Sequence, residues 1–307
     1  MEIIRYHGLV LQTLLLICSM AIPAGVAADP VSIADASGRA VELAHPARRI
    51  VSLAPHVSEL LFEIGANDLL IGAVEFSDYP PAAVEILRIG DYKNFDMESL
   101  LELKPDLVIG WWSGNRSQHI EQIRALGIPV YLSEPRRLDQ IPTLMRDLGR
   151  LSGRRMQSDA VAERFERHLN RLRSQYADQK PVSVFFQAWD QPLMTLNGEH
   201  LVSDAIAICG GTNVFAHLSL LAPTVTVEAV LVADPMVIVT GGIGRARSEW
   251  LERWQRWPQL RAVKHGHLRR IDPDLLQRPT SRILQGLTQL CEILAQARAS
   301  LSKSAPE

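Results

Sequence analysis

The chain has 307 residues, of which 47% are hydrophobic and 21% are charged, and its formal net charge is −2. This composition describes a folded chain of one or two domains with a sizeable core, and it excludes disorder as the main state. The near-neutral charge argues against a nucleic-acid-binding protein, and beyond the N-terminus no apolar run reaches the roughly 18 residues that a membrane span needs.

The first 28 residues form a segment unlike the rest of the chain. The positively charged Arg5 precedes an apolar stretch from Leu9 to Ile22, and small residues follow up to Ala28. This order is typical of an export signal, and we expect cleavage after Ala28 or the alanine before it. The alternative is an uncleaved N-terminal anchor, which the shortness of the apolar stretch disfavours.

Export leaves two cysteines in the mature chain, Cys209 and Cys291, because Cys18 lies within the signal. In an oxidising compartment we expect these two to form a disulfide. The bridge would close a loop of about 80 residues, which stabilises the fold by roughly 4 kcal/mol on the chain-entropy account. Two buried free thiols are the alternative.

The mature chain alternates short β-rich runs with amphipathic stretches. In the first half we expect strands at 49–54, 69–74, 107–110 and 129–132, and helices at 57–64, 97–103 and 120–126. Between Gly153 and Lys180, apolar residues recur every three or four positions, which predicts one helix of about 20 residues. Alternation then resumes with segments at 182–186, 202–208, 228–232 and 236–239. Strands alternating with helices imply parallel sheets.

The two halves resemble each other. Segment 98–109 aligns with segment 228–239, since each reads as a short helix that begins with Glu, a Pro seven residues on, and an apolar strand. Shared order of this kind favours a repeated unit. We therefore predict an α/β molecule with an N-terminal lobe at 29–152, a linking helix at 153–180 and a C-terminal lobe at 181–307, after the signal at 1–28.

Signatures of catalysis are weak. Gly241 to Gly244 follow a predicted strand, but a lone glycine cluster without the full dinucleotide-binding spacing is a poor indication of a site. The chain has no P-loop, no Gly-x-Ser-x-Gly and no His-Glu-x-x-His. We predict that the protein is not an enzyme. A secreted α/β enzyme that binds a phosphate at the glycine cluster is a distant alternative.

Aromatic residues follow several of the predicted strands. Trp111 and Trp112 come after 107–110, Trp189 after 182–186, and Phe76 with Tyr79 after 69–74. Because ligands of open α/β sheets bind beyond the carboxyl ends of the strands, these rings from both lobes could line one cleft for a large, flat, partly apolar ligand. The alternative is that they pack in the core or between the lobes.

Four strings carry a family resemblance: Ala-Pro-His-Val-Ser-Glu-Leu-Leu at 54–61, Phe-Ser-Asp-Tyr-Pro-Pro at 76–81, Lys-Pro-Asp-Leu-Val-Ile at 104–109 and Cys-Gly-Gly at 209–211. Through them, residues 48–295 resemble the helical-backbone substrate-binding proteins of metal-chelate ABC importers, above all the cobalamin-binding ones. The resemblance implies two Rossmann-like lobes joined by one long backbone helix, with a ligand cleft between the lobes. It also implies a periplasmic location and cobalamin as transported ligand, with no cofactor and no catalysis.

The resemblance also implies which residues meet the ligand, namely Phe76, Tyr92, Trp111, Asp274 and Arg278. The chain departs from the cobalamin-binding members, which carry aromatic character at the positions of Ala222, Leu275 and Leu276. Haem or a ferric siderophore is the alternative ligand within the same fold. Siderophores are usually acidic and call for several arginines, whereas this set offers mainly aromatic rings and Arg278, which favours a bulky, nearly neutral ligand.

His56 is a candidate axial ligand to cobalt, because it follows the first strand and an imidazole nitrogen is a good donor to that metal. The alternative is a hydrogen-bonded histidine at the cleft rim. Glu98 and Glu228 hold equivalent places in the two halves, and the resemblance implies that such glutamates dock a monomeric binding protein onto arginines of a dimeric permease. The alternative is that each carboxylate merely stabilises the N-terminus of its own helix.

Overall fold

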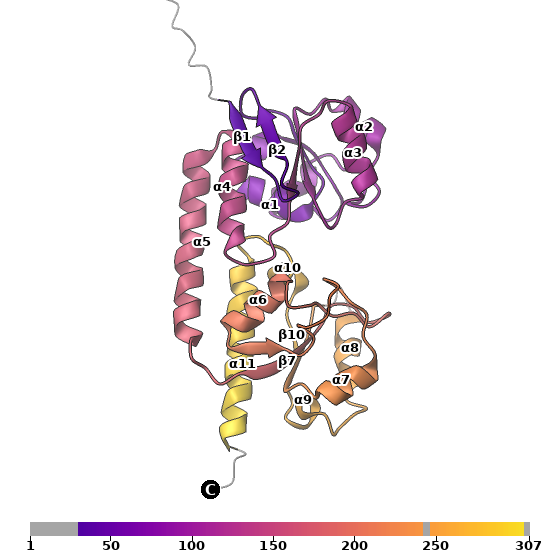
Figure 1. The fold of residues 1–307 in the computed structure, drawn as a ribbon, viewed down its shortest axis with the longest axis vertical. Coiled ribbons are helices and arrows are strands. Elements are labelled where there is room, and N and C mark those ends of the chain that lie inside the picture. Colours follow the sequence, from indigo (N-terminus) through magenta and orange to yellow (C-terminus); the bar gives the residue numbers. More distant parts are fainter. Residues whose placement is uncertain (1–29, 242–245, 304–307) are drawn as a thin grey trace, which may run out of the picture.

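Two parallel sheets form the framework of the molecule. The computed structural model describes residues 30–241 and 246–303. The predicted signal at 1–28 and residues 242–245 of the glycine cluster lie outside the described residues. Figure 1 shows the two sheets in separate lobes, one above the other, with α5 (Arg155–Tyr176) running along one side.

Each lobe contains four parallel strands in the same order. The first sheet runs β4-β3-β5-β6, with β3 (Ile50–Ser52), β4 (Leu70–Ala73), β5 (Leu107–Trp111) and β6 (Val130–Ser133). The second runs β8-β7-β9-β10, with β7 (Val182–Gln187), β8 (Gly211–Asn213), β9 (Val237–Thr240) and β10 (Leu268–Arg270). In both, the first strand along the chain lies between the second and the third. This shared topology confirms the internal repeat and the predicted α/β fold of two lobes.

Helices cover both faces of each sheet. In β5, Leu107 and Ile109 join the core beneath α1 (Pro55–Glu63) and α4 (Gln140–Ser152). Val108 joins a separate core beneath α2 (Met97–Glu102) and α3 (Ser117–Ala125). In β9, Val237 belongs to the first of these cores and Ile238 to a third. A strand buried on both faces reads as a continuous apolar run, which is why these strands could be predicted.

The helices outside α5 divide between the lobes. Those of the first lobe are α1 (Pro55–Glu63), α2 (Met97–Glu102), α3 (Ser117–Ala125) and α4 (Gln140–Ser152), with the short 3-10 helices η1 (Asn67–Leu69) and η2 (Pro81–Glu85). Those of the second are α6 (Leu201–Ile208), α7 (Val227–Ala233), α8 (Ala246–Trp254), α9 (Arg261–Lys264), α10 (Pro273–Leu276) and α11 (Ile283–Lys303). No helix in the described part of the chain combines the length and apolarity that a membrane crossing requires.

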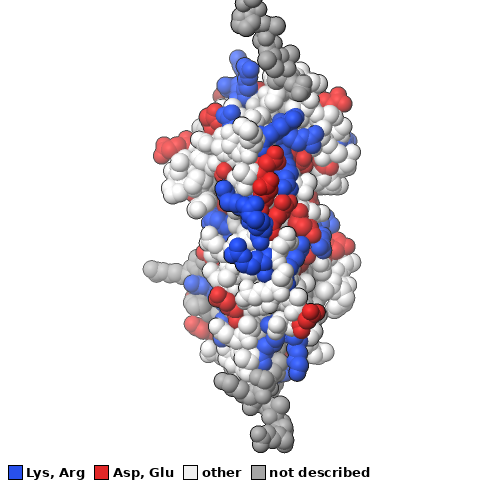
Figure 2. All heavy atoms as spheres, turned by 90° about the vertical axis from the view of Figure 1, so that its left-hand side faces the viewer, with Lys and Arg blue, Asp and Glu red and all other residues white. Residues whose placement is uncertain are grey.

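The long helix α5 joins the lobes and packs against α4 and α11. Its buried apolar residues, among them Phe165 and Leu169, belong to one apolar core that continues through both lobes. The outer face of this side is crowded with charges of both signs (Figure 2), and Arg146 donates to both carboxylate oxygens of Glu166 at 2.6 and 2.9 Å. The linking helix is thus present, while the domain limits at 29–152, 153–180 and 181–307 remain a prediction.

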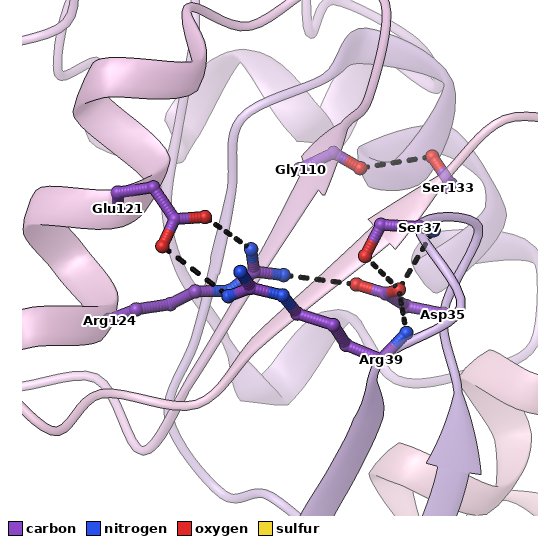
Figure 3. Close-up of polar contacts among 7 residues, drawn as sticks. All are labelled: Asp35, Ser37, Arg39, Gly110, Glu121, Arg124 and Ser133. Carbon is purple, nitrogen blue, oxygen red and sulfur yellow. Dashed lines mark hydrogen bonds and ion pairs between the residues drawn. The ribbon is translucent and has the colours of Figure 1, made fainter.

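Several elements were not predicted, among them β8, β10, α9 and α10. Two others are held by contacts with distant residues. One is α4, whose pattern contains Pro142 and Gly149. Pro142 lies in the first turn, where no backbone N–H is needed, and a Cβ at Gly149 would lie 1.9 Å from Ser158 Oγ of α5, so the glycine permits close helix packing. The other is the antiparallel hairpin of β1 (Val31–Ala34) and β2 (Ala40–Leu43). Its turn is held by Asp35, which pairs with Arg124 of α3 at 3.1 Å (Figure 3).

The disulfide between Cys209 and Cys291 is present, as predicted. It ties the C-terminal end of α6 to the middle of α11, and the two residues are 82 positions apart in the sequence. Both cysteines are fully buried in the apolar core. The bridge therefore fixes α11 to the second lobe.

Candidate functional site

A cleft between the lobes contains residues from both lobes. Its lining from the first lobe is Trp111, Ser113, Glu134, Pro135 and Arg136, and from the second lobe His200, Leu201, Leu221, Gln277 and Pro279. The cavity is small, about 40 Å³, whereas pockets for small molecules commonly measure roughly 300–1,000 Å³. A large ligand must therefore lie across the mouth of the cleft or move the lobes apart.

Trp111 is the last residue of β5 and is half-buried in this cleft. Its backbone N–H donates to Asn115 Oδ1 at 2.6 Å, which folds the following loop back on the strand. A Cβ at Gly114 would lie only 2.1 Å from Trp111 Cε3, so the ring rests directly on glycine backbone. The loop thus holds the indole in one orientation.

Tyr92 and His56 pack against Trp111. The ring centroids of Tyr92 and Trp111 are 5.7 Å apart with the planes tilted by 41°, and those of His56 and Trp111 are 5.9 Å apart, edge to face. The amide of Asn115 donates to the backbone oxygen of Tyr92 at 2.6 Å. The structure therefore brings three of the predicted site residues into one aromatic cluster.

His56 is engaged by hydrogen bonds at the base of this cluster. Ser133 Oγ donates to the backbone oxygen of Gly110 at 3.0 Å (Figure 3), and a hydroxyl carries one hydrogen. The 2.8 Å contact between Ser133 Oγ and His56 Nε2 must then have the histidine as donor. Burial, with a smaller contribution from Arg278, lowers the pKa of His56 to about 3, so the ring is neutral. This geometry favours the hydrogen-bonded alternative for His56.

Phe76 and Trp189 lie outside this cluster. Phe76 follows β4, has a backbone φ of 65° and is 60% exposed. Trp189 follows β7, is 45% exposed and contacts Trp250 edge to face at 5.6 Å. Both rings are accessible from solvent and do not line the small cavity.

Arg278 connects the lobes beside the cleft. It follows α10 in the second lobe, and its Nη1 donates to Asp78 Oδ1 of the first lobe at 3.1 Å. Its Nε lies 3.0 Å from Asp274 Oδ1. Desolvation raises the pKa of the Asp274 carboxyl, while the Arg278 charge opposes that shift. Asp274 and Arg278, the two charged residues predicted to meet the ligand, thus form an ion pair with each other, and their contact with a ligand stays a prediction.

Several residues of this region were missed from the sequence. Asp78 lies inside the Phe-Ser-Asp-Tyr-Pro-Pro string, and Gln277 lies between the predicted site residues Asp274 and Arg278, so the sequence did indicate both positions. Arg282 had none. It binds Glu59 of α1 through two hydrogen bonds of 2.7 and 2.6 Å, and its guanidinium lies 3.8 Å from the centre of the Tyr79 ring. Tyr79 thus lies at the contact between the two lobes.

Glu98 and Glu228 hold matching positions in the two lobes. Each is the second residue of its helix, α2 or α7, and each side chain is exposed. Both helices begin after a capping side chain, that of Asp96 or Thr226, and both lead to the third strand of their sheet. The topology therefore makes them equivalent residues. Among residues 30–241 and 246–303, no group of three or more His, Cys, Asp or Glu side chains is arranged to hold a metal ion.

Comparison with known proteins places the chain among binding proteins. The periplasmic binding protein family matches residues 50–275. The chain is 36% identical over 253 residues to the vitamin B12-binding protein of Vibrio cholerae, an alignment that covers 82% of this chain and 91% of that protein. The crystal structure of the periplasmic vitamin B12 binding protein BtuF of Vibrio cholerae superimposes with a TM-score of 0.77 and 36% identity, and it covers 82% of this chain and 98% of its own.

A haem-binding protein shares the fold at lower identity. The periplasmic haem-binding protein RhuT of Roseiflexus sp. RS-1 superimposes with a TM-score of 0.73 at 23% identity, and the match covers 82% of this chain and 99% of that one. At this identity the likeness concerns the fold alone.

Proposed function

The chain belongs to the periplasmic binding protein family, and from that premise we propose that it binds cobalamin between its lobes and delivers it to an ABC permease. Its vitamin B12-binding relatives, at 36% identity over most of the chain, support this ligand over haem or a ferric siderophore. In this proposal cobalamin is cargo, there is no resident cofactor, and the protein carries out no catalysis. The working form is an exported monomer, cleaved near Ala28, in the periplasm.

The observation that carries the proposal is the aromatic cluster around Trp111, which faces polar groups of the opposite lobe. A corrin ring is large and largely apolar on its faces, and it carries amides at its edge. Trp111 and Tyr92 offer ring surface to such a face, while Asp274 and Arg278 offer an acceptor and a donor to the amides. Phe76 and Trp189, exposed now, would be covered by a ligand that spans the mouth of the cleft.

Replacing Trp111 by alanine should weaken cobalamin binding about thirtyfold, since truncating a buried aromatic anchor commonly costs about 2 kcal/mol or more. Equilibrium titration with cyanocobalamin, haemin and a ferric hydroxamate measures both the loss and the ligand preference. Trp111→Phe is the matched control, because it keeps an aromatic ring against Tyr92 and should keep most of the affinity. Unchanged cyanocobalamin affinity in Trp111→Ala, at an unchanged melting temperature, would refute the assigned cleft.

We infer that His56 does not bind cobalt, because its Nε2 donates to Ser133 and the side chain is only 4% exposed. The absorption spectrum of bound aquocobalamin should therefore be the same in the parent and in His56→Ala. A spectral shift in His56→Ala would show that His56 does serve as an axial ligand to cobalt.

A further inference from the structure

An ionic cluster bridges the two lobes at the side of the cleft. Arg278 lies between two carboxylates, Asp78 of the first lobe at 3.1 Å and Asp274 of the second at 3.0 Å. The arginine side chain is 16% exposed, and the Asp78 carboxylate is 55% exposed. An ion pair with one half-exposed partner is weak, so a ligand can exchange for Asp78 at little cost.

The charge around Arg278 is not balanced. Two carboxylates, those of Asp78 and Asp274, face one guanidinium. The neighbouring cation Arg282 is already matched by both oxygens of Glu59. The three side chains in contact, Asp78, Arg278 and Asp274, therefore carry one positive and two negative charges, and a ligand anion at Arg278 would lie beside both carboxylates.

The backbone around Asp78 is held in place. Ser77 is buried, and its backbone oxygen accepts a hydrogen bond of 2.6 Å from Arg88. On the other side, the Tyr79 ring lies against the guanidinium of Arg282. Asp78 thus stays beside Arg278 whether or not a ligand displaces its carboxylate from direct contact.

We propose that Asp78 is a specificity-determining residue that makes the cleft reject anionic chelates and accept neutral, amide-bearing ones. A ligand amide can accept from Arg278 and donate to Asp78 or Asp274, so it satisfies the cluster with no new charge. A ligand carboxylate must compete with Asp78 for the arginine, and it then lies near two like charges. This inference rests on the proposed function, because it explains which members of the chelate class that site would take.

The test compares cyanocobalamin with its monocarboxylate, in which one peripheral amide is hydrolysed. A like charge several ångströms away at a half-exposed site changes affinity roughly threefold to tenfold. The parent should therefore bind the monocarboxylate more weakly than cyanocobalamin by about that factor. The readout is this ratio of the two affinities, measured within each variant, and Asp78→Asn should bring the ratio close to one. Asp78→Glu keeps the negative charge and should therefore keep the difference in affinity between cyanocobalamin and its monocarboxylate.

Asp178→Asn is the matched control, because it makes the same charge change at an exposed loop position beyond α5. It should leave the ratio of the two affinities at the parent value, and equal melting temperatures show that the variants are folded. If the affinity difference between the two corrinoids persists in Asp78→Asn, or disappears equally in Asp178→Asn, the specificity role of Asp78 is refuted while the proposed function stands. If the parent binds neither corrinoid, the proposed function fails and this inference with it.

Discussion

Replacing Glu98 and Glu228 together by alanine should abolish cobalamin uptake while leaving cobalamin binding intact. The two glutamates are exposed second residues of α2 and α7, the equivalent helices of the repeat. Figure 1 shows these helices on the side of the molecule opposite α5, one in each lobe. A permease dimer can therefore meet both carboxylates at once, with one positive patch for each lobe.

The measurement is uptake in cells or vesicles that contain the cognate permease, together with the rate of docking at several salt concentrations. Because a rim charge acts mainly on association, the docking rate should fall and lose part of its salt dependence. Glu163→Ala with Glu292→Ala is the matched control, since these exposed glutamates lie on α5 and α11 and their loss changes the net charge equally. Normal uptake by the Glu98/Glu228 variant at physiological salt would show that the two carboxylates only stabilise their helices.

Removing the disulfide by Cys209→Ala with Cys291→Ala should lower the free energy of unfolding by about 4 kcal/mol. The bridge closes a loop of 82 residues, and on the chain-entropy account it stabilises the fold by restricting the unfolded chain. The native contacts should change little, because both positions lie in an apolar core that accepts alanine.

Urea titration of the oxidised parent, the reduced parent and the double variant checks this expectation. The reduced parent and the double variant should unfold at the same, lower urea concentration. A thiol assay on the denatured, unreduced parent should find no free thiol in the mature chain. Two titratable thiols, or equal stability with and without reductant, would contradict the prediction.

The sequence determined the features that depend on local pattern. β5 and β9 could be predicted because a strand buried on both faces must be apolar throughout. The long helix could be predicted because α5 buries one face along its whole length. The partnership of Cys209 and Cys291 could be predicted because the third cysteine, Cys18, lies within the predicted export signal. The placement of Trp111 followed because side chains at strand ends meet at one edge of a parallel sheet.

The tertiary structure alone decided which side chains touch across the cleft. Arg278 and Asp78 are 200 positions apart and Arg282 and Glu59 are 223 apart, so no local periodicity could pair them. The same holds for Gly149, which weakens a helix locally yet is required where α4 meets α5. The protonated nitrogen of His56 depends on a chain of hydrogen bonds through Ser133 to Gly110. Sequence pattern reports what each segment buries, whereas selectivity depends on distances between segments, and these exist only once the two lobes are packed together.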